Sequence, residues 1–148
     1  MALTPAELRI LLPDSSIDLG ASVEGRDDAI RLAGSLLVAS GAVTGEYVER
    51  MLERERVVST FVGDGIAMPH GTLSARGSVV REGLSLLVLA EPIDWAGQPV
   101  GVVIGIAAHG RRYITLLSEL ASALLDEGRA EALRAATTAE QARGRLVG

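Results

Sequence analysis

The chain has 148 residues, 48% of them hydrophobic and 22% charged, which is typical of one globular domain, 1–148, with one core. A net charge of −5 argues against a nucleic-acid-binding protein, which normally carries a basic face. The absence of cysteine excludes disulfides, thiolate metal sites and a cysteine nucleophile.

The sequence shows neither a signal peptide nor a membrane span. Its first residues lack a basic start followed by an apolar run. No apolar run approaches the ~18 residues that a membrane-spanning helix needs. A cytoplasmic protein with no direct membrane insertion is the simplest prediction.

The first half of the chain is predicted to be mainly helical. A short helix follows Thr4, and the alternation of polar and apolar residues over 16–19 predicts a short edge strand. Apolar residues at helical spacing then predict helices over 26–40 and 44–56. The charged face of the second helix is typical of a solvated surface, with Arg54 as a possible exception.

The middle of the chain contains the predicted strands. Two short extended runs, 57–62 and 65–68, flank a glycine-rich turn and predict a hairpin. Continuous apolar runs over 84–89 and 100–107 predict strands that are covered on both faces. The segment 91–99 between them is predicted to be a loop, with Trp95 at the edge of the core.

Three further helices are predicted over 112–125, 130–135 and 137–146. The buried stripe of the first is expected to contain Leu116, Leu117, Leu120, Ala121, Leu124 and Leu125. Strands and helices therefore interleave along the chain. The predicted class is α/β, with a mixed sheet between helices.

One histidine stands out, because it is held between a proline and a glycine. Pro69 restricts the backbone before His70, and Gly71 lets another group approach closely. The local pattern alone leaves two interpretations open, a working histidine and an ordinary loop histidine in a Pro-Gly turn.

The other motifs of the chain narrow the possible chemistry. No HExxH or other metal-ligand spacing is present, and neither a P-loop nor a GxSxG elbow occurs, so no metal and no cofactor is predicted. A neutral imidazole such as that of His70 can act as a nucleophile near pH 7. For a phosphoryl electrophile, Thr72 can supply a hydroxyl and an amide, and Arg54 is a reasonable cation.

The segments MLERE at 51–55 and STFVGDGIAMPHGT at 59–72 closely resemble the enzyme IIA domain of the mannitol/fructose class. These domains belong to the bacterial phosphoenolpyruvate-dependent sugar phosphotransferase system. The resemblance continues, in the expected order, through residues 29–34, 93–95, 103–108 and 116–121.

The resemblance implies a phosphocarrier. Residue His70 matches the histidine that takes phosphate from phospho-HPr and passes it to a cysteine of an enzyme IIB component, and Arg54 matches the arginine that helps to hold the phosphoryl group. It implies a mixed five-stranded sheet flanked by helices. Because this chain has no cysteine, the IIB acceptor must lie on a separate polypeptide, alongside a membrane IIC component.

The chain departs from the family at one position. Tyr113 stands where these domains usually carry a second active-site histidine, after Arg111 and Arg112 where acidic residues are common. A tyrosine can donate a hydrogen bond to phosphate, but with a pKa of ~10 it cannot share a proton at neutral pH. Two interpretations of His109 stay open, a residue that compensates for the missing histidine and an exposed loop histidine, and the second is favoured. For Arg111 and Arg112, phosphate contacts and ordinary surface charge both stay open.

Three functions remain in view at this stage. The first is uptake and phosphorylation of mannitol or a related sugar, which the mannitol-like segments 59–60 and 93–95 favour. The second is a regulatory relative of the nitrogen-system type. The third is an interaction domain with impaired phosphotransfer, which the replacement by Tyr113 keeps open.

Overall fold

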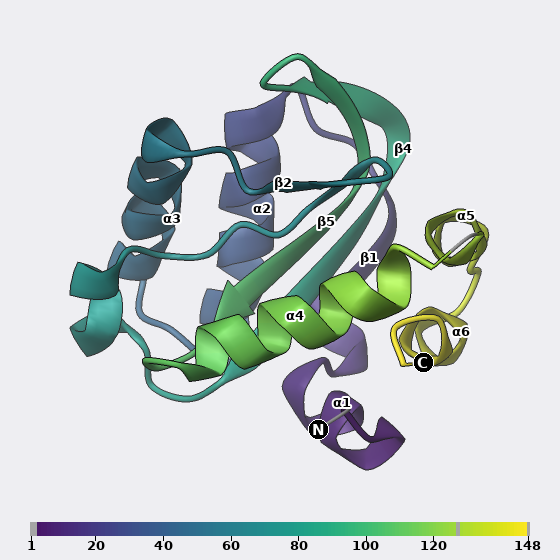
Figure 1. Ribbon diagram of the computed structural model, residues 1–148. Helices are drawn as coiled ribbons and strands as arrows, with labels where there is room; N and C mark the ends of the chain where they lie inside the picture. Colours follow the sequence, from purple (N-terminus) through teal and green to yellow (C-terminus); the bar gives the residue numbers. More distant parts are fainter. Residues whose placement is uncertain (1–2, 127, 148) are drawn as a thin grey trace.

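A mixed sheet of five strands runs through the middle of the molecule (Figure 1). The structure, a computed structural model, describes residues 3–126 and 128–147. Its strands are β1 (Ile17–Ala21), β2 (Phe61–Gly63), β3 (Ile66–Ala67), β4 (Gly83–Trp95) and β5 (Gln98–Ala107). They lie in the order β1-β4-β5-β3-β2. The pairs β1–β4 and β3–β5 are parallel, whereas β4–β5 and β2–β3 are antiparallel.

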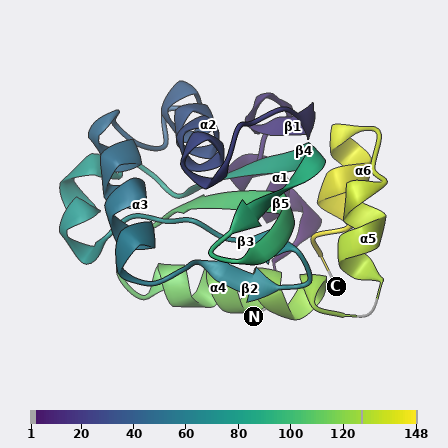
Figure 2. The same ribbon diagram turned by 90° about the horizontal axis from the view of Figure 1, so that it is seen from above.

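Helices cover both faces of this sheet. Helices α2 (Arg26–Ala39) and α3 (Glu46–Val57) lie on one face, and α4 (Arg112–Leu124) lies on the other (Figures 1 and 2). Helices α1 (Pro5–Leu11), α5 (Arg129–Arg134) and α6 (Ala139–Gly144) pack into the same core as α4. Two 3-10 turns, η1 (Asp14–Ser16) and η2 (Leu73–Ser78), complete the described elements. The predicted α/β class, with a mixed five-stranded sheet between helices, is confirmed.

The sheet divides the core into two hydrophobic clusters. Along β5, Val102, Ile104 and Ile106 point to the side of α4, whereas Val103 and Ala107 point to the side of α2 and α3. This alternation follows from the two-residue period of a strand. The continuous apolar runs of the sequence are therefore explained by burial on both faces, and the single core expected from the sequence is formed as two layers.

The two long strands form a tight hairpin, so the predicted loop over 91–99 is wrong. Residues Ala96 and Gly97 alone make the turn, and both have a positive φ, as a two-residue hairpin turn requires. Pairing continues up to Trp95 and Gln98. Polar residues and prolines at the end of a strand made this segment look irregular. Trp95 is fully buried in the cluster under α2, which confirms its predicted place in the core.

Helix α4 is close to its predicted length, but its buried face includes Tyr113 and leaves out Leu125, in contrast to the prediction. It ends before Leu125, which is 44% exposed, while Tyr113 near its start is buried.

The longest described helix, α2, has 14 residues. None of the helices in the described part of the chain combines the length and the apolarity that crossing a bilayer takes.

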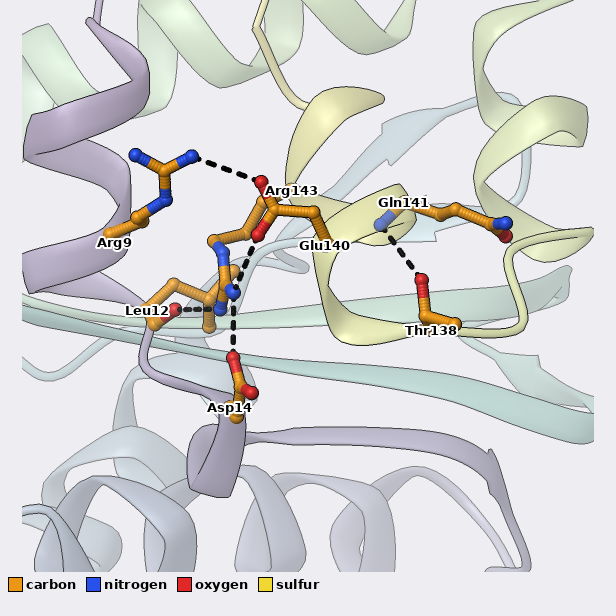
Figure 3. A network of polar contacts seen from close by, with 7 residues as sticks. All are labelled: Arg9, Leu12, Asp14, Thr138, Glu140, Gln141 and Arg143. Atoms are coloured by element: carbon orange, nitrogen blue, oxygen red, sulfur yellow. Dashed lines mark hydrogen bonds and ion pairs between the residues drawn. The ribbon is translucent and has the colours of Figure 1, made fainter.

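The two ends of the chain are joined by a network around Arg143 (Figure 3). This arginine of α6 is only 9% exposed. Its guanidinium donates to the carbonyl of Leu12 at 2.9 Å and forms ion pairs with Asp14 at 2.6 Å and Glu140 at 3.3 Å. Glu140 also pairs with Arg9 of α1 at 3.0 Å. The last helix is thereby fixed to the first.

Candidate functional site

His70 lies where the sheet continues beyond β3 by a single bridge. The amide of Ile106 donates to the carbonyl of Pro69 at 3.0 Å, and His70 forms an isolated parallel bridge with Ile106. Proline lacks a donor but keeps its acceptor, so Pro69 can pair with β5 through its carbonyl. The imidazole is therefore carried by sheet-like backbone, and its position is set by β5.

One hydrogen bond orients the imidazole. Nδ1 of His70 lies 3.0 Å from the carbonyl oxygen of Met68. A carbonyl can only accept, so Nδ1 carries the proton in the neutral ring. Nε2 then holds the lone pair. The ring is half-buried, and burial lowers the pKa of His70 below its ordinary value of 6.5. The hydrogen bond to Met68 raises this pKa and the charge of Arg54 lowers it.

The predicted site residues line a cavity of about 520 Å³. Its polar groups come from three elements, α3, the segment after β3 and the start of α4. Its apolar wall comes from α4, where Ile114 is 66% exposed. The complete lining is Arg54, His70, Gly71, Thr72, Gly110, Tyr113, Ile114 and Leu117. The structure thus brings all four of the predicted site residues to one cavity.

Arg54 lies in the last turn of α3, and its guanidinium donates to the carbonyl of Val58 at 2.7 Å. Beside it, the buried carboxylate of Glu55 accepts from the amide of Thr60 at 2.7 Å and from its hydroxyl at 2.5 Å. Thr60 in turn accepts from the amide of Met68 at 3.0 Å. These bonds of Glu55 and Thr60, called the Glu55–Thr60 clamp below, join the helix that carries Arg54 to the β2–β3 hairpin, which leads into His70.

Thr72 and Tyr113 complete the polar part of the cavity. Thr72 is half-buried, and its carbonyl accepts from the amide of Ala75 at 3.0 Å in turn η2. The ring of Tyr113 packs against that of His70, with centroids 5.2 Å apart and an angle of 48° between the planes. Burial raises the pKa of Tyr113 above 10.0. This hydroxyl is therefore neutral over the whole physiological range.

A second tyrosine, Tyr47, contacts the site residues from the buried side of the cavity, and the sequence did not predict it as a site residue. Its hydroxyl accepts from the amide of Gly71 at 2.9 Å, donates to the carbonyl of Ile106 at 2.7 Å and bonds to the hydroxyl of Tyr113. From the sequence, Tyr47 is one more apolar residue on the buried face of a helix. The only signal was Gly71, whose lack of a side chain indicated that some group approaches closely.

The remaining candidates lie outside the cavity. His109 is exposed and its carbonyl accepts from the amide of Arg112, so the expected loop position is confirmed. Arg112 forms ion pairs with Glu82 at 3.0 Å and Glu7 at 3.9 Å and does not line the cavity. Arg111 is exposed at the start of α4. Within residues 3–126 and 128–147, no group of three His, Asp or Glu side chains could hold a metal ion.

The arrangement suits the transfer of an anionic group. A neutral imidazole with an available lone pair can attack an electrophilic phosphorus, and a guanidinium beside it favours the oxygens of that group. This chemistry defines a class, the proteins that carry a phosphoryl group on histidine.

Comparisons with known proteins agree with this class. The mannitol-specific phosphotransferase enzyme IIA component of Staphylococcus aureus (strain MRSA252) is 43% identical over 131 residues, 88% of this chain and 91% of that relative. The crystal structure of IIA mannitol from Escherichia coli superimposes with a TM-score of 0.83 at 35% identity, covering 89% of this chain and 96% of that one.

A complex provides a third comparison. In the NMR structure of enzyme IIAMTL with phosphorylated enzyme IIBMTL from Escherichia coli, the matching chain is 34% identical, with a TM-score of 0.83 and coverage of 89% of this chain and 94% of that one. The family model described as "Phosphoenolpyruvate-dependent sugar phosphotransferase system, EIIA 2" matches residues 10–146. The chain belongs to this family and is a phosphotransferase of the enzyme IIA type.

Proposed function

We propose that His70 is the phosphoryl acceptor of this enzyme IIA, and that the group arrives from phospho-HPr and leaves to a cysteine of a separate enzyme IIB. The observation that carries the proposal is the orientation of the imidazole. Its Nδ1–H is held by the carbonyl of Met68, so Nε2 presents its lone pair in the cavity that Arg54 also lines.

In the proposed reaction, the lone pair of Nε2 attacks phosphorus while the bond from phosphorus to the donor breaks and its electron pair leaves with the donor. The carbonyl of Met68 stabilises the proton that remains on Nδ1 as the ring becomes cationic. The guanidinium of Arg54 and the amide and hydroxyl of Thr72 bind the equatorial oxygens. A thiolate on enzyme IIB then displaces Nε2, which restores the neutral imidazole.

The wider setting is part of the proposal. Relatives named as mannitol-specific support mannitol or a related sugar, and the complex with enzyme IIBMTL supports the IIB partner. We place HPr upstream and a membrane IIC component downstream, with this chain acting in the cytoplasm as a single domain. The net charge of −5 leaves room for basic partner surfaces.

The acceptor is tested by incubating the chain with enzyme I, HPr and phosphoenolpyruvate and measuring its intact mass. We expect one added phosphoryl group in the wild-type chain and in His109→Ala, and none in His70→Ala. Because the chain has only two histidines, His109→Ala is a matched control. An unchanged mass with active partners, or phosphate on His70→Ala, would contradict the proposal.

The same reaction distinguishes transport from the regulatory alternative. Adding enzyme IIB should remove the phosphoryl group from the chain and place it on the IIB cysteine. A chain that accepts phosphate and transfers it to no mannitol-type enzyme IIB would instead favour a regulatory role.

A further inference from the structure

The inference concerns Tyr47, the second residue of α3, which the proposed mechanism does not use. The side chain of Tyr47 is fully buried, and burial raises the pKa of its hydroxyl, which is therefore always protonated. This hydroxyl lies between two segments of backbone. It accepts from the amide of Gly71, one residue after His70, and donates to the carbonyl of Ile106 in β5. It thus adds a side-chain link between the segment after His70 and β5, beside the backbone bridge of His70 with Ile106.

The count of hydroxyl protons decides which of the two tyrosines, Tyr47 or Tyr113, donates in the hydrogen bond between them. A hydroxyl has one proton to donate and two lone pairs to accept with. The carbonyl of Ile106 can only accept, so it takes the proton of Tyr47. The amide of Gly71 fills one lone pair. Tyr113 must then donate its own proton to the second lone pair of Tyr47. The hydrogen-bonding capacity of Tyr47 is thereby complete, and the only proton of the Tyr113 hydroxyl is engaged.

The ring of Tyr47 also fills the space beside Gly71. A Cβ atom on Gly71 would lie 2.6 Å from Cε1 and 2.9 Å from Cζ of Tyr47, and 3.2 Å from Cβ of Ala75. The glycine after His70 is therefore explained by the approach of this ring. Through one side chain, the segment that carries the imidazole is fixed to β5 by hydrogen bonds and to α3 by packing.

We propose that Tyr47 is a positioning residue for phosphoryl transfer, whose hydroxyl fixes the His70–Gly71 segment to β5 and engages the hydroxyl of Tyr113, so that Tyr113 serves the site with its ring and not as a donor to phosphate. This inference rests on the proposed role of His70. It replaces the expectation that the Tyr113 hydroxyl binds the phosphoryl group.

Removing the Tyr47 hydroxyl should affect the chemical step more than partner binding. In Tyr47→Phe the amide of Gly71, the carbonyl of Ile106 and the hydroxyl of Tyr113 each lose their bond to the Tyr47 hydroxyl, which loosens the segment that carries His70. A small misplacement of a reacting group lowers the rate strongly, so we expect kcat for acceptance from phospho-HPr to fall about tenfold while KM changes less than about twofold.

The matched variant is Tyr113→Phe, which keeps the ring against His70 and leaves Tyr47 bonded to Gly71 and Ile106. We expect it to lower kcat only about two- to threefold, and the double variant to be no slower than Tyr47→Phe alone, because the two hydroxyls act as one unit. The buried residue Leu133 of α5 provides the stability control, because Leu133→Ala weakens the core without touching the site.

Two kinetic results would overturn the inference. One is a loss of kcat in Tyr113→Phe as large as in Tyr47→Phe, which would make Tyr113 a phosphate donor. The other is a loss in Tyr47→Phe no larger than in Leu133→Ala. If the wild-type chain accepts no phosphoryl group, the proposed function fails, and hydrogen exchange decides the positioning role. The Gly71 amide should exchange faster in Tyr47→Phe, and unchanged protection would overturn the role.

Discussion

At the scale of single residues, the site depends on one imidazole whose surroundings act in opposite directions. Burial and the nearby charge of Arg54 disfavour the protonated ring, whereas the carbonyl of Met68 and the carboxylate of Glu55 favour it. Desolvation is the largest of these effects, so the pKa of His70 lies below 6.5. The ring is neutral at physiological pH, which is the state in which Nε2 can attack.

The lowered pKa of His70 predicts a dependence of stability on pH. The unfolded chain carries an imidazole with a pKa of ~6.5, so below that pH it binds a proton that the folded chain resists. The free energy of unfolding should therefore decrease as pH falls through the unfolded pKa of about 6.5, and it should stop decreasing for this reason once the pH lies below the folded pKa. Thermal unfolding of His70→Gln should show a shallower decrease than the wild type. Equal slopes in the two proteins would contradict the assignment.

At the scale of elements, the site is assembled where a helix end meets a hairpin. Arg54 comes from the last turn of α3 and His70 from the segment after β3, so bonds between these two elements must fix the position of one residue relative to the other. The carboxylate of Glu55 does so, because it binds both the amide and the hydroxyl of Thr60 at the start of the hairpin. Both side chains are buried, at 3% and 6% exposed, so these bonds are shielded from water.

Removing the hydroxyl of Thr60 should weaken this junction. Thr60→Val keeps the shape of the side chain but leaves an oxygen of the buried Glu55 carboxylate without its donor. We expect a loss of about 1–3 kcal/mol in the free energy of unfolding, measured by urea denaturation. The neighbouring Ser59 is exposed and its hydroxyl accepts from the amide of Phe61, so Ser59→Ala should cost less than about 0.5 kcal/mol. Equal losses in the two variants would mean that the Glu55–Thr60 clamp contributes nothing.

At the scale of the whole molecule, the sheet separates two hydrophobic cores that are covered by helices of different length and origin. The core under α2 and α3 is formed by long helices in the first half of the chain. The core under α4 is completed by the short helices α1, α5 and α6, which come from opposite ends of the sequence. Short helices are marginal on their own, so their contacts with one another must hold them in place. The network of Arg143 supplies such contacts (Figure 3).

Loss of the Arg143 guanidinium should loosen the ends of the chain without affecting the site. In Arg143→Gln the carbonyl of Leu12 loses its donor and Asp14 loses its ion pair, so we expect a decrease of about 1–2 kcal/mol in stability. Arg145→Gln is the matched control, because Arg145 directly follows α6 and its guanidinium donates to the carbonyl of Gln141 in that same helix, four residues earlier. It should cost less than about 0.5 kcal/mol. A loss in Arg145→Gln that equals that in Arg143→Gln would contradict the role of the network.

The sequence by itself determined most of the elements and the segment on which the site is built. Helical spacing placed α2 and α3, apolar runs placed β4 and β5, and the glycine-rich turn over 63–65 placed the β2–β3 hairpin, because each of these signals is local. The Pro-His-Gly segment and its upstream arginine also carried the resemblance to enzyme IIA domains, which the family match confirms. The chemical roles of His70, Arg54, Thr72 and Tyr113 are still predictions.

Only the tertiary structure decided the order of the strands, the extent of the β4–β5 hairpin and the partners of the site residues. The bond of Tyr47 to Gly71 spans 24 positions, and its bond to Tyr113 spans 66. Such contacts leave no periodic trace in the sequence, because a buried tyrosine on a helix follows the same spacing whether or not its hydroxyl has a function. The hydrogen bonds available to Tyr113 depend on which atoms the fold brings to its hydroxyl, and one of them is the hydroxyl of Tyr47 on α3.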